Sequence, residues 1–209
     1  MTQADTAYNQ ITELIIEGKM SKEYPIFEKD LAEQFNMSRT PIREALKRLI
    51  AEGTVAQFPR RGIFIKTLSR QEVNEIYVMS EALEGMVAYI GAQKRTKMDI
   101  EKMKALLAQM EKHCEDGDSI AWAEADESLH NLNYALCGNK YITEALSRIN
   151  NQVHKTRYLI SRVSLDKKQS NVDHKAIIEA VERGDAELAR QLAFKHLSRV
   201  REQVVQFWI

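Results

Sequence analysis

Apolar side chains in the first third of the chain recur every three or four residues, the spacing of one helix face. This spacing predicts three helices, over residues 7–18, 28–35 and 38–53. Ser38 suits the N-cap of the third helix, and Pro41 falls in its first turn, where a missing N–H does no harm. Two β-rich runs, at 54–58 and 63–67, follow and predict a hairpin.

From Ser69 onward the apolar pattern is helical throughout. Ser69 and Glu72 form a capping box that opens a helix to about residue 93. Further helices are expected over residues 97–114, 118–137, 139–164, 171–183 and 186–207. The pattern therefore predicts a mostly α protein with two domains. An N-terminal winged helix-turn-helix domain is expected over residues 1–68, and an all-helical bundle over residues 69–209.

The composition suits a globular protein, because 44% of the 209 residues are hydrophobic and 29% are charged. We find neither an apolar run that could span a membrane nor a secretory signal at the start. Cys114 and Cys137 are too few and too far apart for a disulfide framework or a paired-cysteine metal site. A cytoplasmic protein without membrane contact is expected.

Charge sums to zero over the chain, which argues against a uniformly basic, histone-like binder. Residues 38–66, however, hold seven basic and two acidic side chains, a local net charge of +5. In a helix-turn-helix, the second helix enters the major groove with its first turn toward the base edges. The candidate DNA contacts on that turn are Ser38, Arg39, Thr40 and Arg43. Arg61 and Gly62 at the hairpin tip would form a wing that reaches phosphate or the minor groove.

Histidines interrupt the apolar stripes of three helices in the C-terminal half. Asp126 and His130 lie four residues apart on one stripe, and His174 and His196 continue the stripes of two later helices. Buried polar groups are costly unless something satisfies them. A divalent metal would satisfy all four, with zinc as the first choice and nickel, manganese or iron as alternatives. The competing interpretation is that each histidine is a core residue bonded to a neighbour.

The run DLAEQFNMSRTPIREALKRLIAEGTVAQFPRRGIFI resembles the DNA-binding domain of the GntR family of bacterial transcription regulators. The resemblance extends over about residues 8–67. It implies a repressor or activator that binds a palindromic operator in double-stranded DNA as a homodimer. It also implies DNA contacts at Arg39, Thr40, Arg43 and Gly62, with Ser38 and Arg61 beside them and Lys29 on a phosphate.

Three later segments, DESLHNLNYALCGN, VDHKAIIEAVERGD and ARQLAFKHL, resemble the sensory FCD domain of the FadR branch of that family. This implies a metal on Asp126, His130, His174 and His196 and disfavours the acyl-CoA-binding type. Members of the branch often carry an arginine where this chain has Ser80, ahead of Glu81-Ala82-Leu83-Glu84. Arg157 is then a candidate contact for an anionic effector, although a surface arginine explains it equally well.

These observations predict a ligand-responsive transcription regulator, expected to be a repressor, that binds a divalent metal and a small organic acid effector. Two alternatives stay open at this point. A metalloenzyme could use the three histidines and Asp126 to activate water, but no nucleophile or general-base motif accompanies them, so an enzyme is not expected. A pure metal sensor would need no organic effector.

Overall fold

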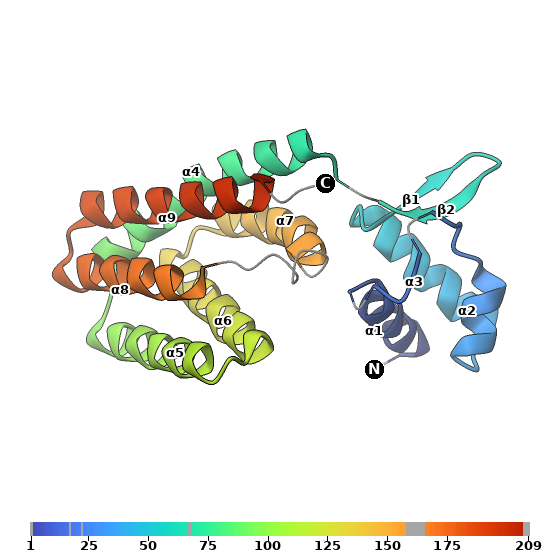
Figure 1. Cartoon of the computed structure of the whole chain (residues 1–209), viewed down its shortest axis with the longest axis horizontal. Helices are drawn as coiled ribbons and strands as arrows, with labels where there is room; N and C mark the ends of the chain where they lie inside the picture. The colour runs from blue at the N-terminus through green and yellow to red at the C-terminus, as the bar shows by residue number, and fades with distance from the viewer. Residues whose placement is uncertain (1, 17, 22, 67, 158–165, 207–209) are drawn as a thin grey trace. The chain divides into compact units, whose positions relative to one another are not determined.

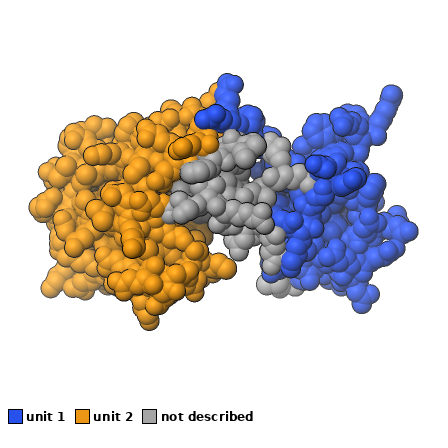
Figure 2. All heavy atoms as spheres, in the orientation of Figure 1, with its two compact units in different colours: residues 1–72, 148–162 blue, residues 73–147, 163–209 orange. Residues whose placement is uncertain are grey.

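The computed structural model describes residues 2–16, 18–21, 23–66, 68–157 and 166–206; for residues 16 and 150–157 it describes the backbone alone. Residues 1–72 and 148–162 form one compact unit, and residues 73–147 and 163–209 form the other (Figure 2). Most of the described chain is helical, with one two-stranded sheet, which confirms the predicted fold class (Figure 1). The predicted domain boundary at 68/69 stays a prediction.

The first unit contains α1 (Gln3–Ile16), α2 (Glu28–Gln34), α3 (Arg39–Ala51), β1 (Val55–Phe58) and β2 (Gly62–Ile65). Helix α1 packs on α3, and the buried side chains of both make the core of this unit: Ala7, Ile11 and Ile15 against Ile42, Ala45, Leu46 and Leu49. The strands pair antiparallel, with Val55 opposite Ile65 and both side chains buried. Ile26 extends this sheet by one bridge, donating its N–H to the Ile63 carbonyl at 2.6 Å.

Three details of the first unit differ from the sequence-based expectations. The first helix spans Gln3–Ile16 instead of 7–18. Ser38 does occupy the N-cap of α3, but its hydroxyl makes no capping hydrogen bond. The strands are each four residues long, and Thr67, the last residue of the predicted second strand, lies outside the described residues.

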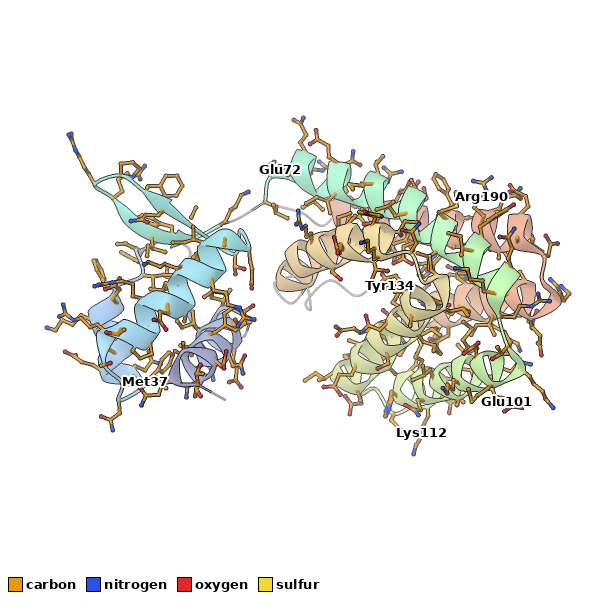
Figure 3. All side chains as sticks on the ribbon, turned by 180° about the vertical axis from the view of Figure 1, so that it is seen from behind. Met37, Glu72, Glu101, Lys112, Tyr134 and Arg190 are labelled. Carbon is orange, nitrogen blue, oxygen red and sulfur yellow. The ribbon has the colours of Figure 1, made fainter. Side chains whose placement is uncertain are left out.

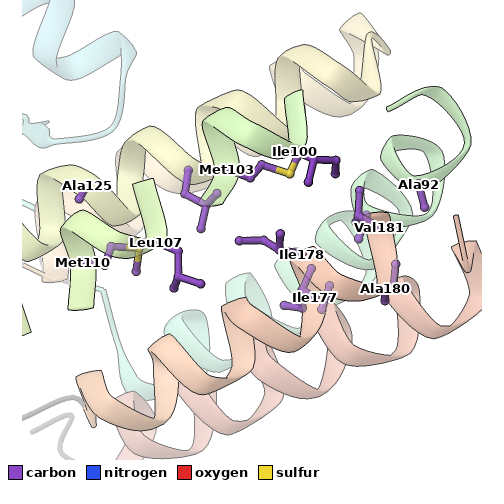
Figure 4. Packing of buried hydrophobic residues seen from close by; sticks show 14 of the residues in the cluster. Ala92, Ile100, Met103, Leu107, Met110, Ala125, Ile177, Ile178, Ala180 and Val181 are labelled. Carbon is purple, nitrogen blue, oxygen red and sulfur yellow. The ribbon is translucent and has the colours of Figure 1, made fainter. Parts of the chain in front are cut away.

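The second unit contains α5 (Lys97–Glu115), α6 (Ser119–Cys137), α8 (Lys167–Arg183) and α9 (Ala186–Gln206), with α4 (Arg70–Lys94) from residue 73 onward and α7 (Lys140–Arg157) up to residue 147. Helices α5, α6 and α8 surround a core that includes Met103, Met110, Leu129, Ile178 and Val181, all at most 3% exposed (Figure 4). Burying each such side chain stabilises the fold by about 1.5–3 kcal/mol. Within the described residues, no helix is long and apolar enough to cross a membrane.

Capping side chains set the starts of two helices in the C-terminal half of the chain. Ser69 and Glu72 form the predicted capping box, with the Ser69 N–H 2.7 Å from the Glu72 carboxylate. Helix α8 begins at Lys167, four residues before the predicted start, because Asp166 caps it by accepting from the Gln169 N–H at 3.0 Å. The part of the predicted helix 139–164 beyond Arg157 lies outside the described residues.

Two cations at the end of α4 bind the carboxyl ends of other helices. Lys94 donates to the Cys137 carbonyl at 2.7 Å, where α6 ends. Arg95 donates to the Ala92 carbonyl of its own helix at 2.8 Å and approaches the Glu182 carbonyl near the end of α8 at 3.4 Å. Because carbonyls at a helix C-terminus carry partial negative charge, both contacts stabilise the bundle.

Candidate functional site

Helices α2 and α3 form the helix-turn-helix, joined by a short turn in which Asn36 adopts a positive φ of 51°. Met37, labelled in Figure 3, follows in this turn. Ile42 and Leu46 of α3 are buried, and this fixes the rotation of the helix. The opposite face is exposed and carries the predicted contacts Ser38, Arg39, Thr40 and Arg43. The structure therefore places these four side chains together at the start of one solvent-facing helix.

Arg43 is held by a carboxylate that sequence analysis did not single out. Its Nε and Nη2 donate to the two oxygens of Glu28 in α2, at 2.9, 3.2 and 2.8 Å. The hydrogen bonds from Arg43 are the main reason why the pKa of the Glu28 carboxyl lies below its usual value, and Arg39 and Lys47 add to the effect. Three of the α3 cations therefore act on the charge of Glu28, whereas Arg48 pairs with Asp5 and Glu52.

Lys29, the predicted phosphate contact, lies on the surface of α2. Its Nζ is 3.7 Å from a Glu33 oxygen, and both side chains are about two-thirds exposed, at 66% and 70%. An ion pair this exposed contributes little to stability, so Lys29 is free to exchange Glu33 for another anion at small cost.

The hairpin tip holds Arg60, Arg61 and Gly62 in a turn with unusual backbone angles. Arg60 has φ 62° and Gly62 has φ 106°, and a Cβ on Gly62 would lie 3.1 Å from the Pro25 Cβ. The fold itself therefore requires glycine here. The Arg61 side chain is exposed and lies 5.9 Å from the Phe64 ring centroid.

Three predicted metal ligands converge in the second unit, one each from α6, α8 and α9. Possible ligand atoms of His130, His174 and His196 all lie within 4.8 Å of one another. The rings are close, with centroids 5.5 Å apart for His130 and His174 and 4.5 Å apart for His174 and His196. Zinc–nitrogen bonds of about 2.0–2.1 Å place two tetrahedral ligand nitrogens about 3.3 Å apart, so the most distant of these atoms would have to approach by more than about 1 Å.

Asp126, the fourth predicted ligand, belongs to the same cluster. One of its oxygens lies 2.9 Å from His174 Nε2 and 3.9 Å from His130 Nε2. Asp126 is 6% exposed, and His174 and His196 are likewise buried. The three histidines therefore form a compact group of possible ligand atoms, and Asp126 adjoins it through His174 and His130. Imidazole nitrogens with a carboxylate oxygen are a donor set that suits zinc, nickel, manganese or iron.

A second carboxylate, Asp173 of α8, orients His196. Its Oδ2 accepts from His196 Nδ1 at 3.0 Å and from Arg199 Nε at 2.9 Å. Because an ionised carboxylate only accepts, Nδ1 carries the shared proton, and Nε2 of His196 keeps its lone pair. Burial and the neighbouring His174 lower the pKa of His196 to about 4, so the ring is neutral near pH 7.

Glu84 of α4 is the corresponding group behind His130. Its carboxylate lies 3.4 Å from His130 Nδ1 and accepts a hydrogen bond from the Tyr134 hydroxyl. Burial would raise the pKa of Glu84, but His130 and Tyr134 outweigh burial and hold that pKa below its usual value. Tyr134, labelled among the helices in Figure 3, follows His130 by one turn on α6.

The cluster borders a small cavity of about 20 Å³. Its polar lining consists of Glu84, Asn133 and the three histidines, and the remaining lining is apolar: Val87, Ala88, Ile177, Ala193 and Leu197. This volume is enough for one water-sized guest. Among the described residues, no lysine or arginine lines the cavity.

Two family profiles match successive parts of the chain. The profile "Bacterial regulatory proteins, gntR family" matches residues 3–65, and the FCD domain profile matches residues 75–199. The chain belongs to the GntR family of bacterial transcription regulators. As a GntR-family protein with an FCD domain, it is a DNA-binding transcription regulator and not an enzyme, as expected.

Relatives of this GntR-family chain match over most of their length. An uncharacterized HTH-type regulator, YdhC of Bacillus subtilis, is 26% identical over 91% of this chain and 86% of that protein. The HTH-type transcriptional repressor RspR of Escherichia coli is 24% identical over 87% of this chain and 80% of its own. The solved structure of E. coli McbR/YncC shares the fold, with a TM-score of 0.79, 18% identity and 99% coverage of both chains.

The structure adds five residues to the candidate sites of this GntR-family protein that the sequence pattern did not indicate: Glu28, Glu84, Tyr134, Asp173 and Arg199. Tyr134 had a usable signal, because it lies four residues after His130 on the same stripe. Asp173 had none, because its neighbour His174 points to a different side of the helix. Arg157, the predicted effector contact, ends α7, and its side chain lies outside the described residues.

Proposed function

We propose that this GntR-family regulator is a metal-dependent member of the FadR branch that controls transcription as a homodimer. In this proposal the exposed start of α3 and the wing bind operator DNA, and a divalent metal in the FCD domain carries the regulatory signal. The convergence of His130, His174, His196 and Asp126 from three helices is the observation that supports it most strongly.

For DNA binding, Arg39, Thr40 and Arg43 would meet base edges, with Ser38 beside them. Lys29, Arg61 and Gly62 would meet the phosphate backbone or the minor groove. Gel-shift titrations should show that Arg39→Ala/Arg43→Ala weakens binding to a duplex selected from a random library by the wild-type protein. Phosphate contacts release counterions, so wild-type affinity should also fall steeply with salt. Equal binding by the double variant would refute this assignment.

For the metal, the ligands would be the three histidine Nε2 atoms and an Asp126 oxygen. A bound divalent cation would supply positive charge and open coordination positions for an oxygen donor. Elemental analysis of purified protein should find about one metal per chain in wild type and a large loss in His174→Ala. His113→Ala is the matched control, because His113 lies at the end of α5, outside the cluster. Equal metal content in the two variants would contradict the proposal.

A small organic acid is the effector that the donor set supports, because carboxylate oxygens suit the open positions of such a metal. The cavity of about 20 Å³ is too small for it as it stands, so lining side chains would have to move outward. The small size of the cavity favours a second candidate function, in which the metal ion itself is the regulatory signal.

One experiment separates these two functions. Anisotropy of a labelled duplex is followed with chelated protein, then after adding Zn²⁺ or Ni²⁺, and then after adding lactate, citrate or a dicarboxylate. A change on adding metal alone indicates a metal sensor. A change that needs both metal and acid indicates an organic acid effector, and an acid response without metal would contradict both.

An exposed apolar stripe on α4 is the face that we propose for self-association. Val78, Met79 and Met86 of this helix are 41–49% exposed and lie on one side with Ala82. Phe194 of α9, 42% exposed, lies beside this stripe because Gly85 lets the two helices approach closely. Exposed apolar patches of this kind mark interaction sites, and two-fold pairing would bury the stripe against itself. Met79→Glu should shift the protein toward monomer in analytical ultracentrifugation.

A further inference from the structure

Arg43 is the α3 side chain best placed to bind a base, and the structure shows it already engaged by Glu28 of α2. The contact uses both carboxylate oxygens and leaves the Arg43 side chain 56% exposed, while that of Glu28 is 28% exposed. An exposed arginine normally samples many rotamers and carries about 2 kcal/mol of rotamer entropy. The two-point contact restricts that freedom before any DNA arrives.

The contact occupies only one edge of the guanidinium. An arginine has five N–H donors, and Glu28 takes those of Nε and one of Nη2. The remaining donors, on Nη1 and the other side of Nη2, form the end of the fork. Two parallel N–H groups at this end match guanine O6 and N7, the commonest specific arginine contact in the major groove. Arg43 is therefore able to keep Glu28 and bind guanine at the same time.

The Glu28 carboxylate also opposes wrong contacts. A phosphate oxygen that approached Arg43 from the Nε side would meet this negative charge instead of free donors. Like charges at such a distance repel, so the pair disfavours a sequence-independent backbone contact by Arg43.

We infer that Glu28 is a specificity-determining residue for operator recognition, which positions the Arg43 guanidinium for guanine and disfavours its use as a phosphate contact. This inference rests on the proposed DNA-binding role of Arg43. It assigns a function in DNA recognition to an acidic residue, outside the basic patch that first pointed to DNA.

The test compares Glu28→Gln with Glu33→Gln. Both substitutions remove one negative charge from α2, but Glu33 contacts Lys29 and not Arg43, so it controls for the change in net charge. The probes are a duplex selected from a random library by wild-type protein, the same duplex with the Arg43-dependent base pair replaced, and an unrelated duplex. The Arg43-dependent pair is the one at which Arg43→Ala loses discrimination.

Glu28→Gln should lower discrimination at that base pair by roughly five- to tenfold, a large part of what one bidentate contact provides. Binding to the unrelated duplex should stay equal or rise. Glu33→Gln should keep the wild-type discrimination, and circular dichroism should show the same helix content in both variants.

Two results would overturn the inference. Unchanged discrimination in Glu28→Gln would show that the ion pair is only a surface contact. Equally tighter binding of both variants to all three duplexes would show that Glu28 acts through charge alone. If Arg43→Ala loses discrimination at no base pair, the proposed role of Arg43 fails first, and the inference falls with it.

Discussion

Replacing Asp173 by asparagine should weaken metal binding without removing any proposed metal ligand. Asp173 accepts from His196 Nδ1 at 3.0 Å and so keeps the proton on that nitrogen. Arg199 Nη2 lies 3.5 Å from the same Nδ1. Without the carboxylate, Arg199 or the new amide becomes the donor to Nδ1, and the ring proton moves to Nε2. The lone pair that faces the metal is then lost.

The expected size follows from the chemistry of groups that orient metal ligands. Loss of such a group lowers metal affinity by about 10- to 100-fold, or about 1.4–2.7 kcal/mol. Because Arg199 is already in place as an alternative donor, the upper half of this range is expected. Asp173 is 21% exposed and also pairs with Arg199 at 2.8 Å, so some loss of fold stability will accompany the change.

The assay is calorimetric titration of chelated protein with Zn²⁺ and Ni²⁺, supported by the visible spectrum of the Co²⁺-loaded form. Asp166→Asn is the matched control, because it removes the same charge from α8 at the helix cap, where it bonds Gln169. Asp166→Asn should lower thermal stability but leave metal affinity near wild type. Equal affinities in Asp173→Asn and wild type would refute the positioning argument, whereas a wild-type protein that binds no metal would refute the proposed site itself.

Three further changes test the packing and the titration of the fold. Burial and the hydrogen bond to the Glu52 carboxylate raise the pKa of the Tyr8 hydroxyl to about 12. The unfolded chain therefore loses the Tyr8 proton at lower pH than the folded chain does. Urea titrations between about pH 10 and 12 should show a fall in the free energy of unfolding that is absent in Tyr8→Phe. Gly62→Ala should lower unfolding free energy by about 1–3 kcal/mol, since φ 106° strains any residue with a Cβ, and thermal melts of the variant will show it. Trp122→Phe removes the buried donor 3.0 Å from Asn171 and should cost about 1–3 kcal/mol in chemical unfolding. An unchanged melting curve in Gly62→Ala would show that the glycine is dispensable. An unchanged free energy of unfolding in Trp122→Phe would show the same for the hydrogen bond to Asn171.

Helices were predictable here because helical periodicity and caps are local properties. The capping box at Ser69 and Glu72 was found from four residues, and it is present in the structure. The start of α8 was missed because its first turn, Lys167–Ser170, has no apolar stripe, although the Asp166 cap is itself a local signal. The cap residue Asp166 therefore marks the start of α8 more closely than the hydrophobic pattern does.

The convergence of the three histidines was predictable because polar residues on apolar stripes are anomalous, and three separate helices carried that anomaly; the metal itself stays a proposal. The groups around the histidines were not predictable, because each pairing joins elements that only the tertiary fold brings together. Asp173 and His196 are 23 residues apart, and Glu28 and Arg43 are 15 apart. A charged residue on a helix is ordinarily a solvated one, so the sequence offered no reason to select these.

The balance of buried charge in the bundle supports a dication at the histidines. The buried carboxylates of the described chain include Glu81, Glu84 and Asp126. Glu81 forms an ion pair with Arg201 of α9, whose Nε lies 2.5 Å from a Glu81 oxygen. Glu81 directly follows Ser80, the position at which members of the family often have an arginine. Glu84 and Asp126 have histidines as neighbours instead, and an imidazole offsets a carboxylate charge only when it is protonated. In the proposed metal-bound form, one divalent ion would balance both carboxylates and leave the histidines unprotonated. Without the ion, the same balance would need two imidazolium ions side by side, against their mutual repulsion and the cost of burying them.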